Sequence, residues 1–268
     1  MVVVPYMTKS GAEACAEAGI SWFDLAGNAS IRAPGLIVRI EGKPNPLPPR
    51  GRPSSAFSPR GARIARALLR EPNLAVSQRE LMKETGLSEG YVSKVVHRLE
   101  TQRLLLRDGT ARLRVADPDA LLAAWAEDYD FKKHVIVEGH ISARRGMDLI
   151  PALDEKLAWH EIDHAFTGLA AAWLMTHHAE FRVATVYVER VPDDDELVTM
   201  GFRPEPRGAN TWLVVPNDPD ILLRRLQIEG RPCVTEAQVW LDLRAHPERA
   251  QEAAEELKAH HLPWTRHA

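Results

Sequence analysis

Residues 77–115 read SQRELMKETGLSEGYVSKVVHRLETQRLLLRDGTARLRV, and the pattern of this stretch decides the fold that we expect. Ser77 and Glu80 have the spacing of a capping box, in which each side chain binds a free backbone N–H at a helix start. Gly86 suits the left-handed residue that ends a helix, and Ser88 can cap the next helix. We therefore expect a first helix, a tight turn and then a second helix.

The second helix has an apolar side and a polar side. Its apolar residues recur at spacings of three and four, which predicts one buried stripe made of Val92, Val95, Val96 and Leu99. Asp108 and Gly109 then form a typical hairpin turn, and residues 112–115 (RLRV) alternate like a strand. This order of elements predicts a winged helix-turn-helix, whose second helix enters the major groove of DNA. A helical hairpin inside a larger core is the plainer alternative.

The predicted DNA contacts come from several segments of this motif. Arginines of a preceding helix, which Ser58 and Pro59 begin, would meet phosphates. The first two turns of the second helix would meet base edges, and the wing strand would meet the backbone or the minor groove. The candidate DNA-binding residues are Arg60, Arg63, Arg66, Gln78, Arg79, Ser88, Glu89, Gly90, Tyr91, Ser93, Lys94, His97, Arg98, Arg112 and Arg114.

Composition fits a globular protein with a local nucleic-acid face. The chain has 268 residues, 45% of them hydrophobic, and a formal net charge of −3. Residues 50–70 carry six arginines and no acidic residue, whereas residues 193–195 are all aspartate. There is no apolar run of membrane-spanning length and no signal peptide, which predicts a cytoplasmic protein without membrane contact. Cys15 and Cys233 match no metal-ligand spacing, so we expect both to be buried thiols.

Periodicity and composition predict a mixed α+β protein. The expected parts are a small α/β segment (1–43), a proline-rich linker (44–57), the winged helix-turn-helix (58–116), a connecting helix and strand (117–147) and a last α/β domain (148–268). In the last domain, Thr235 and Gln238 are spaced as a second capping box, and Pro247 is expected to begin the final helix.

Asp24, Glu41 and Lys43 follow one another like the metal site of a PD-(D/E)xK nuclease. In such a site two carboxylates hold Mg²⁺, and the lysine lies beside the attacking water or the phosphate. The linker that begins at residue 44 leaves no room for the rest of that core. We therefore expect these residues to be structural, with Asp24 and Asn28 stabilising a turn.

Thr167 and Gly168 lead into an apolar helix, and residues 182–189 (RVATVYVE) form the next strand, as in a nucleotidyltransferase core. There a glycine turn meets the phosphates and the strand supplies paired carboxylates for Mg²⁺. Here Glu189 is the strand's one acidic residue, which predicts a domain without catalytic activity and without a cofactor. His160 and His164 are four residues apart, but residues 162–166 read as a strand, so no metal site is expected there.

Several segments together resemble the AbiEi family of transcriptional regulators and antitoxins of type IV toxin–antitoxin systems. The most particular are DLAGNA (24–29) and QVWLDL with ERAQEAAEEL (238–243 and 248–257), and the resemblance covers nearly the whole chain. It implies DNA binding by the winged helix, repression of the protein's own operon and a C-terminal domain like a nucleotidyltransferase. It also implies a cognate toxin of nucleotidyltransferase type, and that Met1 can be a shortened start.

We therefore predict a sequence-specific regulator that binds double-stranded DNA and has no catalytic activity. Two other functions stay open. One is a Mg²⁺-dependent nuclease that the winged helix targets to DNA. The other is a regulator whose last domain keeps a pocket that senses a nucleotide or RNA.

Overall fold

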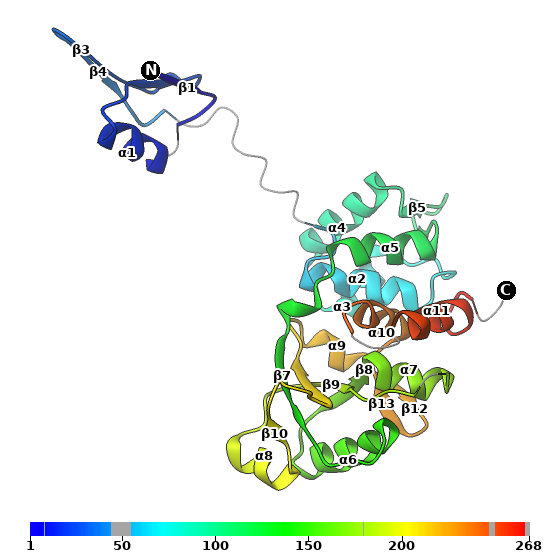
Figure 1. Cartoon of the computed structure of the whole chain (residues 1–268). Helices are drawn as coiled ribbons and strands as arrows, with labels where there is room; N and C mark the ends of the chain where they lie inside the picture. Colours follow the sequence, from blue (N-terminus) through cyan, green and yellow to red (C-terminus); the bar gives the residue numbers. More distant parts are fainter. Residues whose placement is uncertain (8, 44–54, 179, 247–249, 266–268) are drawn as a thin grey trace. The chain divides into compact units, whose positions relative to one another are not determined.

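The computed structural model describes residues 1–7, 9–43, 55–178, 180–246 and 250–265, and the chain forms two compact units, residues 1–55 and 56–268 (Figure 1). Both units contain helices and strands, so the mixed α+β class predicted from the sequence is confirmed. Among the described residues, no helix is long and apolar enough to cross a membrane.

The first unit is a four-stranded sheet with one helix. Its strands lie in the order β1-β2-β3-β4, with β1 parallel to β2 and the other neighbours antiparallel. The elements are β1 (Val2–Val4), α1 (Lys9–Glu17), β2 (Trp22–Asp24), β3 (Ala29–Ala33) and β4 (Leu36–Ile40). Their positions agree with the sequence prediction, and Gly19 and Gly27 supply the left-handed residues between elements.

The second unit begins with the predicted winged helix-turn-helix. Its elements are α2 (Pro59–Arg70), α3 (Gln78–Thr85), α4 (Glu89–Thr101), β5 (Leu105–Arg107) and β6 (Leu113–Val115). The capping box of Ser77 and Glu80 is present, and Gly86 ends α3 with a φ of 66°. The apolar stripe of α4 is buried as predicted, and β5 pairs with β6 as an antiparallel wing.

A seven-stranded sheet forms the rest of this unit, in the order β10-β7-β11-β9-β8-β13-β12. Helices α6 and α7 pack against β9, and α10 and α11 pack on α7. The elements are α5 (Pro118–Asp128), the short helix η1 (Phe131–Lys133), β7 (Val135–His140), α6 (Gly146–Trp159), β8 (His164–Thr167), α7 (Gly168–Thr176), β9 (Ala184–Val188), α8 (Asp194–Met200), β10 (Arg203–Pro204), β11 (Thr211–Val215), α9 (Asp220–Leu223), β12 (Leu226–Ile228), β13 (Arg231–Cys233), α10 (Glu236–Leu243) and α11 (Ala250–His260).

The winged helix and the seven-stranded sheet share one hydrophobic core. Buried apolar side chains form a single cluster that extends from Ala56, through Trp125 of α5, to Leu262. Helix α2, the first helix of the DNA-binding motif, contacts both α5 and α10, so it joins this motif to the rest of the unit (Figure 1). The parts 58–116 and 148–268 therefore belong to one compact unit.

The predicted capping box at α10 is wrong. Thr235 is the residue before the helix, but its side chain makes no capping hydrogen bond. Gln238 is fully buried and instead donates to Tyr129 Oη (3.1 Å) and Asp242 Oδ1 (2.9 Å). The spacing of Thr235 and Gln238 could not show this, because the Gln238 amide finds a buried partner in Tyr129, which is distant in sequence. Pro247, the expected start of the final helix, lies outside the described residues.

Candidate nucleic-acid interface

Helix α4 presents a continuous polar surface to solvent. Its apolar side is anchored on the core by Val92 and Val96, which are 0% exposed. Ser93, Lys94 and His97 are exposed on the opposite side, and Glu89 and Gly90 are exposed in its first turn. The helix and the wing lie on the far side of α2 and α5 from the seven-stranded sheet (Figure 1). This arrangement leaves the predicted recognition surface open to a DNA groove.

Tyr91 was predicted to contact bases, but in the structure it joins α4 to α2. Its ring packs against the core, and its hydroxyl lies 2.9 Å from Ser58 Oγ at the start of α2. The guanidinium of Arg60 lies over the same ring, 5.5 Å from its centroid. Tyr91 therefore fixes the first turn of α4 against α2, which sets the direction in which Ser93 and Lys94 point.

Arg112 was predicted to face DNA from the wing, and in the structure its side chain binds neighbouring segments of the winged helix. Its guanidinium donates two hydrogen bonds to the carbonyl of Ala75 (3.0 and 2.6 Å) and one to Glu80 (2.9 Å). Because Glu80 also belongs to the capping box, Arg112 ties the wing to the start of α3. Arg114, two residues later on β6, is exposed and remains a candidate for a phosphate contact.

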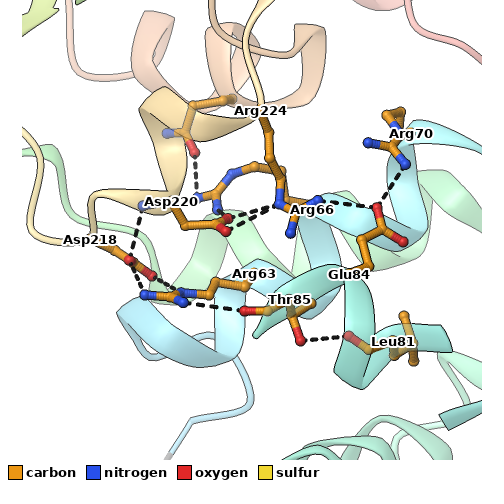
Figure 2. A network of polar contacts seen from close by, with 10 residues as sticks. Arg63, Arg66, Arg70, Leu81, Glu84, Thr85, Asp218, Asp220 and Arg224 are labelled. Carbon is orange, nitrogen blue, oxygen red and sulfur yellow. Dashed lines mark hydrogen bonds and ion pairs between the residues drawn. The ribbon is translucent and has the colours of Figure 1, made fainter. Parts of the chain in front are cut away.

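Arg63 and Arg66 are the larger correction, because α2 directs both toward the sheet domain. Arg63 makes a bidentate ion pair with Asp218, with N–O distances of 2.7 and 2.6 Å. Arg66 donates to Asp220 (2.8 Å) and to Gln238 (3.2 Å), and both members of the Arg66–Asp220 pair are 3% exposed. Figure 2 shows this arrangement. A buried guanidinium cannot meet a phosphate, so Arg66 is a structural residue.

These pairs belong to a network that we call the clasp, made of Arg63, Arg66, Arg70, Glu84, Asp218, Asp220 and Arg224 (Figure 2). Glu84 at the end of α3 accepts from Arg70 (2.7 Å) and from Arg224 (3.3 Å). Arg63 also donates to the carbonyl of Thr85 (3.2 Å). The clasp thus joins α2 and α3 to the segment at the start of α9. The sequence did not reveal this network, because Asp218 and Asp220 lie 155 and 154 positions from Arg63 and Arg66.

The remaining candidates divide by exposure. Arg60, Arg79 and Ser88 are exposed, and Gln78 and Arg98 are half-buried. Ser88 precedes α4 but makes no side-chain capping bond, so its hydroxyl faces solvent beside Glu89 and Gly90. Apart from Arg60 on α2, the exposed candidates therefore extend from the start of α3 along α4 to the wing strand.

Two family models match the chain, one over the winged helix and one over the part that follows it. Residues 57–112 match the model of the MarR family. Residues 114–262, more than half of the chain, match the model described as a transcriptional regulator, the AbiEi antitoxin of type IV toxin–antitoxin systems. The chain belongs to the AbiEi antitoxin family. It is a DNA-binding transcriptional regulator. Neither the curated proteins nor the solved structures contain a match to it.

The AbiEi domain fills the space around its glycine turn with its own side chains. Gly168 has a φ of 56°, and a Cβ atom added there would lie 2.5 Å from Nε2 of His246. His246 stacks on Trp212, with ring centroids 4.8 Å apart, and its Nε2 lies 3.0 Å from Thr185 Oγ1. A phosphate placed against this turn would collide with the imidazole.

Beneath the turn lies a buried polar cluster around Asp242. The carboxylate accepts hydrogen bonds from Thr167 (2.5 Å), from Gln238 (2.9 Å) and from Tyr129. Burial raises the pKa of the Asp242 carboxyl to about 6, although the hydrogen bonds from Thr167, Tyr129 and Gln238 oppose this rise. Burial also lowers the pKa of the nearby His134 to about 4.

Strand β9 of the AbiEi domain carries no acidic residue within Ala184–Val188. Thr185 and Tyr187, which share one side of the strand, are fully buried, and Glu189 beyond its end is exposed. In the part of the chain that the structure describes, no three histidine, cysteine or acidic side chains come together as metal ligands. His160 ends α6 while His164 begins β8, so the two histidines are not on one helix.

Asp24, Glu41 and Lys43 occupy different surroundings in the first unit. Asp24 is 3% exposed and accepts from the backbone N–H groups of Asn28 (2.8 Å) and Met7 (3.0 Å). Asn28 also holds the backbone of Lys43 through two hydrogen bonds (2.8 and 3.1 Å). Glu41 is exposed and pairs with Arg39 (2.8 Å). The predicted turn-stabilising role of Asp24 and Asn28 is therefore confirmed.

Proposed function

We propose that this AbiEi-family regulator represses the operon that encodes it by placing α4 in the major groove of its operator. The observation that carries the proposal is the exposed polar side of α4 on a helix whose other side is locked into the core. The ammonium of Lys94 can donate to guanine, and Ser93 and His97 offer further hydrogen bonds to base edges. Bound protein at the promoter would then exclude the polymerase.

The wing and α3 supply the contacts that do not depend on sequence. Arg79 and Arg114 are exposed, and arginines in these positions attract phosphates whatever the base pair. Tyr91 and Arg112 act as positioning residues, because one orients α4 and the other orients the wing. Base contacts from α4 and backbone contacts from the wing together define one binding site.

A reporter fused to the protein's own promoter tests this proposal. The wild-type protein is expected to lower reporter output, and Lys94→Ala is expected to restore much of it. Lys132→Ala is a matched control, because Lys132 is an exposed lysine on η1, outside the winged helix. Unchanged output with the wild-type protein would refute repression of its own operon.

We also infer that the C-terminal domain does not transfer nucleotides. Two features support this inference: His246 occupies the space in front of Gly168, and β9 carries no carboxylate that could hold Mg²⁺. Incubation with labelled nucleoside triphosphates and Mg²⁺ should leave RNA and protein unlabelled. Labelling that disappears in Thr185→Ala would contradict the inference.

The nuclease alternative is tested separately. Supercoiled DNA should stay intact when it is incubated with the protein and Mg²⁺ or Mn²⁺, and cleavage lost in Glu41→Ala would favour the nuclease alternative.

The family implies a second role, in which the protein counters a cognate toxin of nucleotidyltransferase type. We propose that the AbiEi domain performs this role, because the winged helix is occupied with DNA. Co-expression with a toxin encoded in the same operon should restore growth, and Lys94→Ala should restore it equally well. Loss of protection in that variant would place the antitoxin activity in the winged helix instead.

A further inference from the structure

A small cavity of the AbiEi domain lies where the start of α6, the second half of α7 and the segment before β9 meet. Its volume is about 210 Å³. Three arginines line it: Arg144 and Arg145 directly precede α6, and Arg182 lies just before β9. Among the described residues of the lining, Glu180 alone is acidic. We call this cavity the arginine pocket.

The backbone brings the arginines of the two segments together. A Cβ atom added at Gly146 would overlap the carbonyl group of Phe181, so only glycine allows this close approach. Arg145 and Arg182 are the chain neighbours of Gly146 and Phe181, and they are therefore held near each other although they lie far apart in sequence. The position of these arginines is fixed by packing of the fold.

Positive charge dominates the lining of the arginine pocket. Three guanidiniums share it with the single carboxylate of Glu180. Asp148, on the first turn of α6, pairs with Arg145 at 3.2 Å. Arg144 is exposed and makes no ion pair with any residue that the structure describes. Gathering like charges raises the Coulomb energy of the free protein, and a bound anion would turn this repulsion into attraction.

The lining favours phosphate oxygens as the anion. The planar fork of arginine matches phosphate with two parallel hydrogen bonds, and the first turn of α6 adds backbone N–H groups. Pockets that enclose drug-sized ligands measure roughly 300–1,000 Å³, so 210 Å³ suits a phosphate or diphosphate group better than a whole nucleotide. The rest of such a ligand would lie along Trp173, a half-buried ring of the lining.

The arginine pocket is separate from the two other surfaces of this unit. Gly168, Thr185 and His246, which surround the glycine turn, do not line it. Helix α6 lies on the far side of the seven-stranded sheet from the winged helix (Figure 1). A DNA duplex held by α4 is therefore remote from these arginines.

We propose that the arginine pocket is a ligand site of the AbiEi domain that binds the phosphate or diphosphate group of a small molecule. Binding requires no Mg²⁺ carboxylates and no nucleotide transfer, so it is compatible with a domain that lacks catalytic activity. The inference does not depend on DNA binding.

Isothermal titration calorimetry on the full chain, at constant ionic strength, tests the arginine pocket. Pyrophosphate and ADP are expected to bind at one site, and adenosine, which has no phosphate, is expected not to bind. Arg144→Gln and Arg182→Gln should each raise the dissociation constant roughly 10-fold or more, because each removes charged hydrogen bonds to the phosphate. Arg207→Gln is the matched control, since Arg207 is an exposed arginine of the same domain outside the lining. The replaced side chains are exposed, so circular dichroism should show the wild-type fold.

The two phosphate probes distinguish the sources of the ligand. Equal dissociation constants would mean that the pocket recognises the phosphates alone, and tighter binding of ADP would mean that the nucleoside adds contacts beside Trp173.

Four results would overturn the proposal. The first is the absence of binding by pyrophosphate and by ADP. The second is binding that Arg144→Gln and Arg182→Gln leave unchanged, which would place the phosphate elsewhere, for example on the winged helix. The third is an equal loss in Arg207→Gln, which would indicate attraction to charge in general. The fourth is adenosine that binds as tightly as ADP.

Discussion

At the scale of single residues, Lys94 and Arg114 represent two kinds of DNA contact. Lys94→Ala should cost on the order of 1–3 kcal/mol on the operator and far less on random DNA, because it removes a base contact. Arg114→Ala should weaken both complexes about equally and lower the salt slope by roughly one ion. Salt titrations followed by fluorescence anisotropy measure both effects, with Lys132→Ala as the control. Unchanged operator affinity in both variants would show that α4 does not read the groove.

The raised pKa of Asp242 predicts how the stability of the protein depends on pH. Its folded pKa of about 6 lies above the ordinary value of 3.8, so the folded state keeps a proton that the unfolded state releases between these values. The contribution of Asp242 to stability is therefore present below pH 4 and is lost as the pH rises through 6, a change of roughly 2–3 kcal/mol. Asp242→Asn cannot titrate, so its stability relative to wild type should rise over this range. Urea unfolding from pH 4 to 7 measures the difference, and a constant difference would contradict the shift.

At the scale of elements, the two acidic residues of the clasp should differ in importance. Asp220→Ala leaves the Arg66 guanidinium buried without its ion pair, which should cost roughly 3–5 kcal/mol of unfolding free energy. Asp218→Ala should cost less, because the Arg63 side chain is 19% exposed and water can solvate it. Replacing Arg66 and Asp220 together by Met and Leu should recover most of the loss. Equal urea midpoints for both single variants would refute this ranking.

The sequence predicted the winged helix well because its signals are local. Ser77, Glu80 and Gly86 act within one helix, and the stripe of α4 depends on its own periodicity. The partners of Arg63, Arg66 and Arg112 are distant in sequence, and only the fold brings them close. Because the sequence does not reveal these partners, all three arginines were predicted to contact DNA. Gln238 failed as a cap for the same reason. The exposed residues of α4 came from the same reasoning, but their contacts with bases stay a prediction.

At the scale of the whole molecule, the shared core ties the DNA-binding motif to the AbiEi domain. Helix α2 of the winged helix has eight buried residues and packs against α10 as well as against its neighbours α3 and α4. Removing either the AbiEi domain or the rest of the winged helix would expose the apolar surface of α2 and leave the clasp charges unpaired. We therefore expect residues 56–268 to unfold in one cooperative step, so that the recognition helix has no stability of its own.

Hydrogen exchange in urea can test this cooperativity within the intact chain. The amides of α2 and α4 should lose protection at the urea concentration where tryptophan fluorescence changes. Residues 58–116 contain no tryptophan, so the fluorescence reports chiefly on the AbiEi domain, through residues such as Trp125 and Trp212. Asp220→Ala should shift both transitions together, because the clasp belongs to the shared unit. If α4 instead opens at lower urea than the AbiEi domain, the winged helix is an independent domain.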